Sequence, residues 1–216
     1  KGFTIDAIPN DLDRDVVDAA EYIMTSMGFV LGVQTDFPVL LYLYGCAGAG
    51  KTVLLDWMLH YLDSDMVHYM NVSDDSKHAM NVGIKIGHTY KAKRVITNPD
   101  IQGKIKLATY SKLLNLIDPR SKDKICVEGK GQAQSYVERP RDVNLCAAVT
   151  SNCSLADAVS GDIEAAERRT IEIPFLVPLG DRIPKGADFD KHLSDKEDLF
   201  LLLCLAFAKR EVRNCR

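Results

Sequence analysis

Hydrophobic residues recur every three or four positions in several stretches of the chain, and this spacing predicts helices. The spacing is clearest in residues 15–32, 105–117 and 197–209, and residues 163–169 resemble the end of a helix. One turn of an α-helix holds between three and four residues, so each stretch places its apolar side chains on one face. The mostly apolar stretch 53–62 predicts a further helix, buried in the core.

Short, continuous apolar runs lie between these stretches, and they predict strands. Residues 38–44, 93–100, 143–149 and 171–176 each hold such a run. Runs of this length suit buried strands and are too short for most helices. Residues 67–72 are a weaker candidate for a strand. The chain therefore combines helices with short strands.

Two short extended pieces flank a glycine-rich turn in the middle of the chain. They are residues 124–128 and 135–137, with Gly129-Lys130-Gly131 between them. Glycine is favoured in hairpin turns because it adopts backbone torsions that other residues avoid. The pattern predicts a β-hairpin with Lys130 at its tip.

The stretch 45–52 matches the phosphate-binding motif G-x-x-x-x-G-K-[ST] at every defined position. It follows a predicted strand and precedes a predicted helix, which is the context that such a loop requires. The glycines let successive N–H groups point at phosphate oxygens, and the helix N-terminus adds partial positive charge. Lys51 can then reach the β- and γ-phosphates, and the Thr52 hydroxyl can bind Mg²⁺. The eight residues are Gly45, Cys46, Ala47, Gly48, Ala49, Gly50, Lys51 and Thr52.

The alternative for this stretch is a glycine-rich turn between a strand and a helix that binds nothing. Such a turn would not require Lys51 and Thr52 at the end of the motif. Because motif and context agree, the sequence predicts a site for a nucleoside triphosphate.

Composition restricts the class of protein. The chain has 216 residues, of which 46% are hydrophobic, enough for one domain with its own core. No apolar run is long enough to cross a membrane, and no signal-peptide pattern is present. The six cysteines form no C-x-x-C pair and no metal-ligand spacing, which favours free thiols in a reducing, intracellular compartment. The chain begins at Lys1 and ends abruptly at Arg216, so we expect a piece of a longer protein.

Charge is distributed unevenly along the chain. The net charge is −3, which argues against a generally basic nucleic-acid coat. Residues 91–142, however, hold twelve Lys and Arg against six Asp and Glu. A basic middle in an acidic chain suits a focused anionic partner. An ordinary solvated surface is the alternative interpretation.

Four features of the chain stand in a fixed order: the phosphate loop, a strand ending in Asn98-Pro99-Asp100, an apolar strand ending in Asn152, and Arg168-Arg169 before a third strand. This order resembles the superfamily 3 helicases of viruses, phages and plasmids. The similarity is greatest to the helicase part of poxvirus-type and phage-type primase–helicases. The phosphate loop alone is common to many ATPases, so the ordered set is the specific part.

Three sequence segments carry the resemblance over nearly the whole chain. Residues 147–152, AAVTSN, are similar to the family's sensor strand, and residues 167–175, ERRTIEIPF, to its arginine segment. Residues 199–208, LFLLLCLAFA, resemble the helix that commonly follows. The resemblance implies an α/β fold with an AAA+-like P-loop NTPase core. In that core a parallel sheet lies between helices, and a β-hairpin precedes the sensor strand.

The resemblance also implies an activity and an assembly. The family forms homo-hexameric rings around nucleic acid, with ATP held between neighbouring subunits. We therefore expect an ATP-dependent helicase motor of DNA replication that uses Mg²⁺ and moves on single-stranded DNA, in a host cytoplasm or nucleus if the protein is viral. Residues 1–37 would be a helical lead-in, 38–176 the ATPase core and 177–216 a helical end, all in one domain. A primase domain can precede it on the same chain.

The resemblance assigns roles to four further residues. Asn152 matches the polar sensor that positions the attacking water, although a strand-end turn residue is the simpler interpretation. Arg169 matches the arginine finger that reaches into the next subunit's site, and Arg168 is either that finger or an exposed ion-pair partner. Lys130 matches the hairpin lysine that contacts the nucleic-acid backbone, although most hairpin lysines are only solvated.

Asn98 departs from the family, which tends to have glutamate at this position before a proline. An amide cannot act as a base, although it can orient water. Asp100 could supply the missing carboxylate and, with Thr52, bind Mg²⁺. Otherwise the acid lies elsewhere, this form hydrolyses ATP poorly, or the residue was changed deliberately.

Four functions remain open at this point. The first is a DNA helicase motor, and the second is a nucleotide-gated ring that binds nucleic acid with weak hydrolysis. The third is an RNA-virus relative acting on RNA, which the sequence does not exclude. A small-molecule kinase is the fourth, and it would leave the sensor and arginine segments without a purpose.

Overall fold

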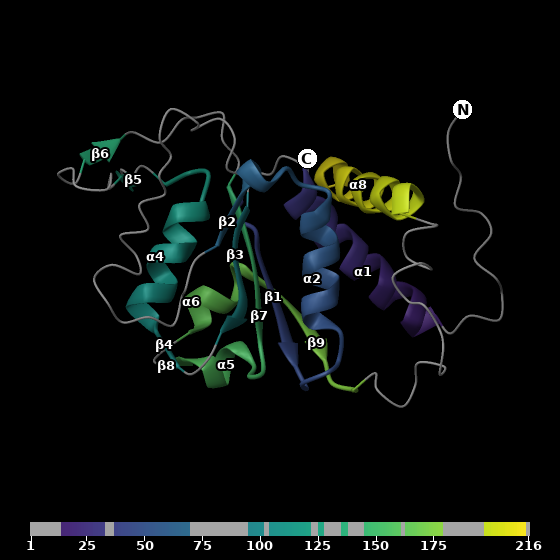
Figure 1. The fold of residues 1–216 in the computed structure, drawn as a ribbon, viewed down its shortest axis with the longest axis horizontal. Coiled ribbons are helices and arrows are strands. Elements are labelled where there is room, and N and C mark those ends of the chain that lie inside the picture. The colour runs from purple at the N-terminus through teal and green to yellow at the C-terminus, as the bar shows by residue number, and fades with distance from the viewer. Residues whose placement is uncertain are drawn as a thin grey trace.

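The structure of the chain is a computed structural model, which describes residues 14–32, 37–69, 95–101, 104–121, 125–127, 135–137, 145–160, 163–178 and 197–214. Helices and strands are interspersed along these residues (Figure 1). In chain order the elements are α1 (Arg14–Leu31), β1 (Leu40–Gly45), α2 (Lys51–His60), a 3₁₀ turn (Ser64–Met66), β2 (Val67–Tyr69), β3 (Val95–Ile101), β4 (Ile105–Lys106), α4 (Leu107–Ile117), β5 (Ile125–Val127), β6 (Ser135–Val137), β7 (Cys146–Ser151), α5 (Leu155–Ala158), β8 (Val159–Ser160), α6 (Glu164–Glu167), β9 (Thr170–Phe175) and α8 (Glu197–Asn214).

Five strands form the central sheet in the order β2-β3-β7-β1-β9, and every neighbouring pair is parallel. β1 lies between β7 and β9, with Leu40 opposite Ala147 on one side and Thr170 on the other. All five strands therefore end at the same edge of the sheet. In open parallel sheets this edge is where ligands bind.

Helices cover both faces of the sheet, and the alternation of side chains along β1 explains why. Leu40 and Tyr42 contribute to one core, whereas Leu41 and Leu43 contribute to the other. Successive side chains of a strand point to opposite faces, so a strand covered on both sides is apolar throughout. Figure 1 shows α4, α5 and α6 on one side of the sheet and α1, α2 and α8 on the other. The predicted α/β fold, with a parallel sheet between helices, is confirmed.

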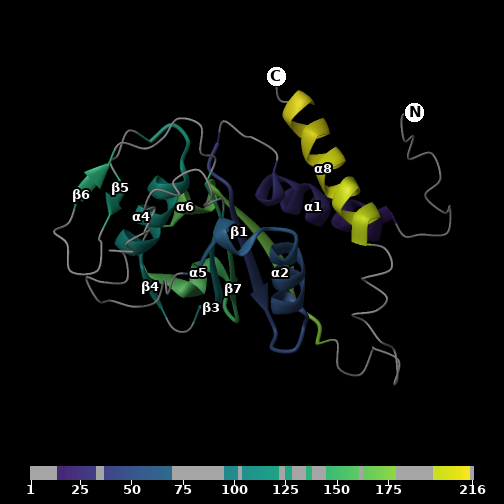
Figure 2. The same cartoon turned by 45° about the horizontal axis from the view of Figure 1, so that its top comes forward.

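The first and last described helices pack against each other on the same side as α2 (Figure 2). Their backbones approach closely at Gly28, where a Cβ would overlap the carbonyl oxygen of Cys204 and lie 2.7 Å from the Cβ of Ala208. Only glycine fits at such a crossing. Residues near both ends of the described chain therefore complete one hydrophobic core with the strands.

Several predicted elements have different limits in the structure. Ile105–Lys106 is a short strand that pairs with Val159–Ser160, so the helix α4 begins only at Leu107. The last helix continues to Asn214 rather than ending at residue 209. These differences arise from pairing and packing between distant segments, which local periodicity does not report.

The strand β3 was predicted over residues 93–100, and its described part runs from Val95 through Pro99 to Ile101, one residue past the predicted end. A proline inside a sheet removes a ladder donor and is tolerated at bulges. The register of β3 against β7 shifts between Asn98 and Ile101, as expected for such a bulge. The helix predicted over residues 53–62 begins at Lys51 as α2, and it is not buried on all sides because Val53 is half exposed.

The hairpin strands pair antiparallel as predicted, with Ile125 opposite Val137 and Val127 opposite Ser135. Lys130, which was predicted at the tip, lies outside the described residues. None of the helices in the described part of the chain is long and apolar enough to cross a membrane.

Candidate nucleotide site

The phosphate loop connects the end of β1 to the start of α2. Gly45, Gly48 and Gly50 have φ values of 130°, 70° and 90°. These torsions are strained for residues with a Cβ, so the glycines of the motif serve the backbone of this loop. Gly50 is the residue before α2 and provides no side-chain cap. The first N–H groups of a helix lack partners within the helix, which makes this end suited to an anion.

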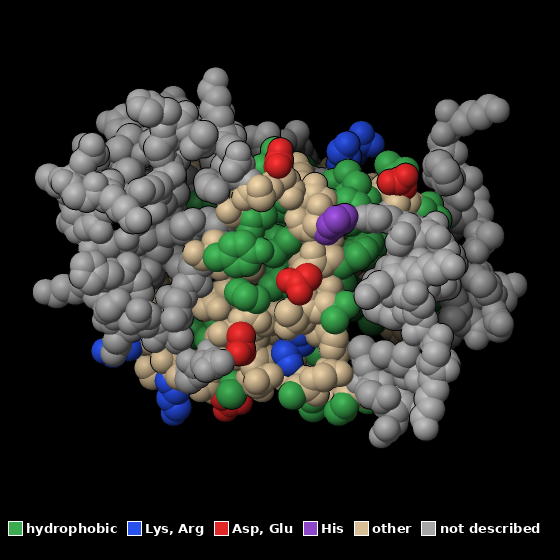
Figure 3. Space-filling model, viewed as in Figure 1, with side chains coloured by type: hydrophobic (Ala, Val, Ile, Leu, Met, Phe, Trp, Pro, Cys, Tyr) green, Lys and Arg blue, Asp and Glu red, His purple; other side chains and the backbone are tan. Residues whose placement is uncertain are grey.

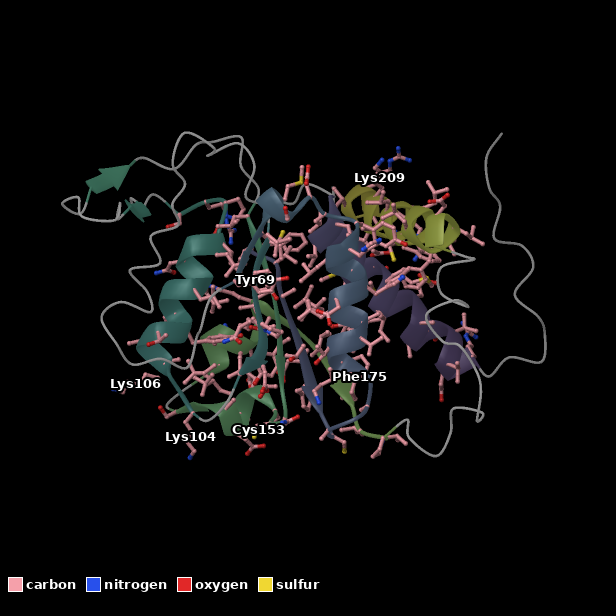
Figure 4. The ribbon with its side chains drawn as sticks, viewed as in Figure 1. Tyr69, Lys104, Lys106, Cys153, Phe175 and Lys209 are labelled. Carbon is pink, nitrogen blue, oxygen red and sulfur yellow. The ribbon has the colours of Figure 1, made fainter. Side chains whose placement is uncertain are left out.

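Gly45 is needed for a second reason, because the loop passes close to the end of β9. A Cβ at Gly45 would lie 2.6 Å from the carbonyl carbon of Phe175. The N–H of Cys46 donates to the Phe175 carbonyl at 2.8 Å, and the Cys46 thiol donates to the Leu176 carbonyl at 3.2 Å. The loop is thereby fixed to the neighbouring strand. Figure 4 shows Phe175 at the end of the sheet where this loop lies.

The Lys51 ammonium is the centre of the site. It donates to the carbonyls of Gly45 at 2.9 Å and Cys46 at 2.7 Å, and to the Asn152 Oδ1 at 3.1 Å. Three bonds use all three of its N–H donors. The side chain is only 7% exposed although lysine is seldom buried. The structure therefore brings together Lys51 and Asn152, two predicted site residues that are 101 positions apart.

Residues of β1 and β7 hold the loop that carries Asn152. The Tyr42 hydroxyl donates to the Cys153 carbonyl at 3.1 Å, and the Cys153 N–H donates to the Ser151 hydroxyl at 3.1 Å. Burial raises the pKa of Tyr42 to about 12, so its hydroxyl keeps its proton near neutral pH. Cys153 and Phe175 both lie at the lower end of the sheet in Figure 4. Tyr42 thus fixes the loop that carries the predicted sensor residue, Asn152. In the sequence Tyr42 was only one residue among others of a predicted strand.

Asn98 and Asp100 lie differently although they are two positions apart. Asn98 is 6% exposed, and its Oδ1 accepts from the Asp100 N–H at 3.3 Å. Its Nδ2 is buried and has no hydrogen-bond partner. The Asp100 carboxylate is exposed, and it follows the bulge at the end of β3. Of the two residues, Asp100 is therefore the one that presents a charged group to solvent.

Thr52 and Asp100 are the predicted Mg²⁺ ligands, and both are exposed in the structure. Thr52 is exposed in the first turn of α2. Asp100 lies two strand spacings from β1, roughly 10 Å across the sheet. Among the described residues no group of three His, Cys, Asp or Glu could hold a metal. Mg²⁺ commonly uses one or two protein ligands with phosphates and water, so Thr52 and Asp100 are sufficient in number to hold it with a bound nucleotide.

The two arginines lie away from the loop. Arg169 precedes β9 and lies six positions before Phe175, which pairs with Gly45. At about 3.3 Å per residue, this places Arg169 roughly 20 Å from the phosphate loop of its own chain. Both arginines are exposed, and Arg168 forms an ion pair with Glu164 one helical turn earlier. The structure does not bring either arginine to Lys51 within one chain.

Two lysines of the basic middle are exposed near the edge of the sheet that carries the phosphate loop (Figure 4). Lys104 and Lys106 are exposed and lie at the lower end of Figure 4. On the face shown in Figure 3, hydrophobic side chains gather over the centre, and Lys and Arg lie mainly at the margins. That face therefore presents no large basic surface among the residues described.

Four thiols among the described residues, those of Cys46, Cys146, Cys153 and Cys204, are free. Burial raises the pKa of Cys204 to about 12, which is expected of a thiol packed between helices. Cys46 and Cys153 are exposed beside the phosphate loop and Asn152. The structure thus agrees with the absence of paired cysteine motifs in the sequence.

Comparisons with known proteins give only distant similarities. No family model and no curated protein matches the chain. The apo structure of the NrS-1 C-terminal region is 17% identical, with a TM-score of 0.48, over 94% of this chain and 42% of that one. The structure of JCV helicase is 16% identical, with a TM-score of 0.44, over 87% of this chain and 53% of that one. The chain spans about half the length of these structures, and likenesses this weak do not assign it to a family.

Proposed function

We propose that this chain is the ATPase motor of a replicative DNA helicase, which binds ATP with Mg²⁺ and moves along single-stranded DNA as a homo-hexameric ring. The observation that carries the proposal is the contact of Lys51 with both the phosphate loop and Asn152. A lysine at this place neutralises the β- and γ-phosphates, and an amide beside it can contact the γ-phosphate or the attacking water. Binding and hydrolysis of a nucleoside triphosphate account for both residues.

The position of the arginine segment supports a site shared between subunits. Arg169 is about 20 Å from the phosphate loop of its own chain, by the register of β9 against β1. It is also exposed, as a residue that contacts a neighbouring chain must be before assembly. An arginine supplied in trans stabilises the charge of the transition state and raises the rate by about 10³ or more.

The first experiment measures phosphate release with Lys51→Ala. We expect hydrolysis to be abolished, because the phosphates lose their main cationic partner. Lys209→Ala is the matched control, since Lys209 is an exposed lysine on α8, away from the loop in Figure 4. Hydrolysis by Lys51→Ala within twofold of the parent chain would refute the proposed nucleotide site.

A mixing experiment tests the shared site. Arg169→Ala should bind ATP nearly normally and hydrolyse it very slowly. Mixed with Lys51→Ala, it forms interfaces that pair an intact Lys51 with an intact Arg169 from the neighbour, and these should regain part of the activity. No recovery, in mixtures shown to form joint rings, would count against Arg169 and favour Arg168. Particle images with and without ATP would show directly whether a six-fold ring forms.

A second candidate is a nucleotide-gated ring that binds nucleic acid with only weak hydrolysis. Asn98 favours it, because this residue replaces the expected acid and its amide oxygen is engaged with the Asp100 N–H. Steady-state phosphate release with and without single-stranded DNA separates the two functions. A motor should be stimulated by the strand, and a clamp should remain slow in both conditions. Single-stranded RNA in the same assay distinguishes the two nucleic acids.

A further inference from the structure

A buried tyrosine connects α4 with the turn that carries the two arginines. Tyr110 is fully buried, and its hydroxyl lies 2.7 Å from the Thr170 Oγ1. Thr170 is the first residue of β9 and follows Arg169 directly. The two residues are 60 positions apart, so the contact joins separate segments of the fold.

The direction of these hydrogen bonds follows from the other partner of Thr170. The Thr170 hydroxyl donates to the Ala166 carbonyl at 2.8 Å. Because a hydroxyl has one proton, the Tyr110 hydroxyl must donate to Thr170. Burial raises the pKa of Tyr110 well above its usual value of 10, so this proton is retained near neutral pH. The result is a directed chain of bonds from Tyr110 through Thr170 to Ala166.

The same carbonyl also fixes the backbone of the arginine. The Arg169 N–H donates to the Ala166 oxygen at 3.0 Å, beside the bond from Thr170. In the turn from α6 to β9, the Ala166 carbonyl thus accepts hydrogen bonds from both Thr170 and Arg169. The Tyr110 hydroxyl connects this turn to α4. An exposed arginine that must reach another subunit depends on a rigid backbone at its base, because small displacements at a reacting centre are costly in rate.

We propose that Tyr110 is a positioning residue for hydrolysis, which orients Arg169 through the bonds of Thr170. The inference rests on the proposed function, in which Arg169 completes the nucleotide site of a neighbouring subunit. Tyr110 does not touch the nucleotide and acts only through the arginine turn. The helix α4 lies in the chain between β4, which carries the exposed Lys106, and the β-hairpin of the predicted nucleic-acid contact. The hydrogen bond between Tyr110 and Thr170 therefore also joins the arginine turn to this segment.

The experiment is a double-mutant cycle between Tyr110→Phe and Arg169→Ala, with steady-state hydrolysis as the measurement. Tyr110→Phe keeps the ring and removes the donor. We expect kcat to fall about three- to tenfold, the range for loss of one neutral buried hydrogen bond, with KM unchanged. In chains that already carry Arg169→Ala, Tyr110→Phe should change the rate by less than twofold, since the group it positions is absent.

Tyr42→Phe is the matched control. Tyr42 is an equally buried tyrosine of the same core, and its hydroxyl holds the Cys153 loop instead of the arginine turn. Its effect should persist when Arg169→Ala is added. Thr170→Val and Thr170→Ser form a second pair of variants. Valine removes the hydroxyl and should lower kcat as Tyr110→Phe does, whereas serine keeps the hydroxyl and should retain the parent kcat.

The possible outcomes separate this inference from the proposed function. If the parent chain does not hydrolyse nucleotide and Lys51→Ala changes nothing, the proposed function itself fails. If the parent is active, but Tyr110→Phe and Arg169→Ala reduce the rate independently, Tyr110 does not act through Arg169. A rise in KM without a change in kcat would equally overturn the positioning role. If Tyr110→Phe does not fold, the Thr170 pair decides between the same outcomes.

Discussion

Substitution of Asn152 tests the contact on which the nucleotide site depends, because Asn152→Asp should raise stability and weaken ATP binding, whereas Asn152→Ala should lower stability and leave binding nearly unchanged. Asn152→Asp replaces a neutral oxygen 3.1 Å from the Lys51 ammonium with a charged one. A unit charge pair at about 4 Å gains about 1 kcal/mol in water and about 4 kcal/mol near a protein surface. Asn152 is exposed, so we expect a gain of about 1–2 kcal/mol in the free energy of unfolding without nucleotide.

A gain of this size should raise the Tm by about 2–8 °C for a chain of this length. Asn152→Ala removes one bond from a charged donor, worth about 1.5–3 kcal/mol, and should lower the Tm by about 3–12 °C. Nucleotide affinity should respond differently. The new carboxylate neutralises Lys51 and repels the γ-phosphate, so Asn152→Asp should weaken ATP binding about 10- to 100-fold, a cost of about 1.4–2.8 kcal/mol. Asn152→Ala should change the affinity by less than threefold and lower kcat.

The measurements are thermal unfolding without nucleotide and titration with ATP, both at low ionic strength so that screening does not hide the charge effect. ADP is a useful comparison, since without a γ-phosphate the loss of affinity caused by Asn152→Asp should be smaller. The reasoning is refuted if both variants shift the Tm in the same direction. It is equally refuted if the aspartate variant binds ATP as tightly as the parent.

Three further predictions concern other parts of the chain. Gly28→Ala should lower the free energy of unfolding by about 1–3 kcal/mol, because the Cβ of the alanine would overlap the Cys204 carbonyl. Helix propensity alone predicts the opposite, a gain of about 1 kcal/mol. Gly32→Ala, whose Cβ would lie 3.7 Å from the nearest side chain, should be neutral in the same denaturant titration. Lys130→Ala should weaken binding of single strands and reduce its salt dependence without changing nucleotide affinity; an unchanged salt slope would mean that this lysine is only solvated. Asn98→Glu should raise the hydrolysis rate if an acid is missing there, and an unchanged rate would favour Asp100 as the acting carboxylate.

Local sequence was sufficient to predict the parts of the structure that depend on neighbours along the chain. The phosphate loop was predicted with its flanking strand and helix, since glycine torsions and a helix N-terminus are local properties. The helix predicted over residues 15–32 is α1, because one apolar face in the right period is enough to specify it. The strand and helix order also followed, except where short pieces such as β4 and β8 form only by pairing with each other.

Which distant residues come into contact depends on the packing of the elements in three dimensions. Lys51 and Asn152 were both predicted site residues, yet their contact depends on β7 lying beside β1, which only the strand order establishes. Tyr110 carried no signal in the sequence, because a buried tyrosine on an apolar helix face is expected in any core, and its role appears only with Thr170 opposite it. Periodicity along a chain states which face of an element is buried and does not state what covers it. The partners are chosen by packing among all the elements at once, and that is why the contacts of this site could not be obtained one segment at a time.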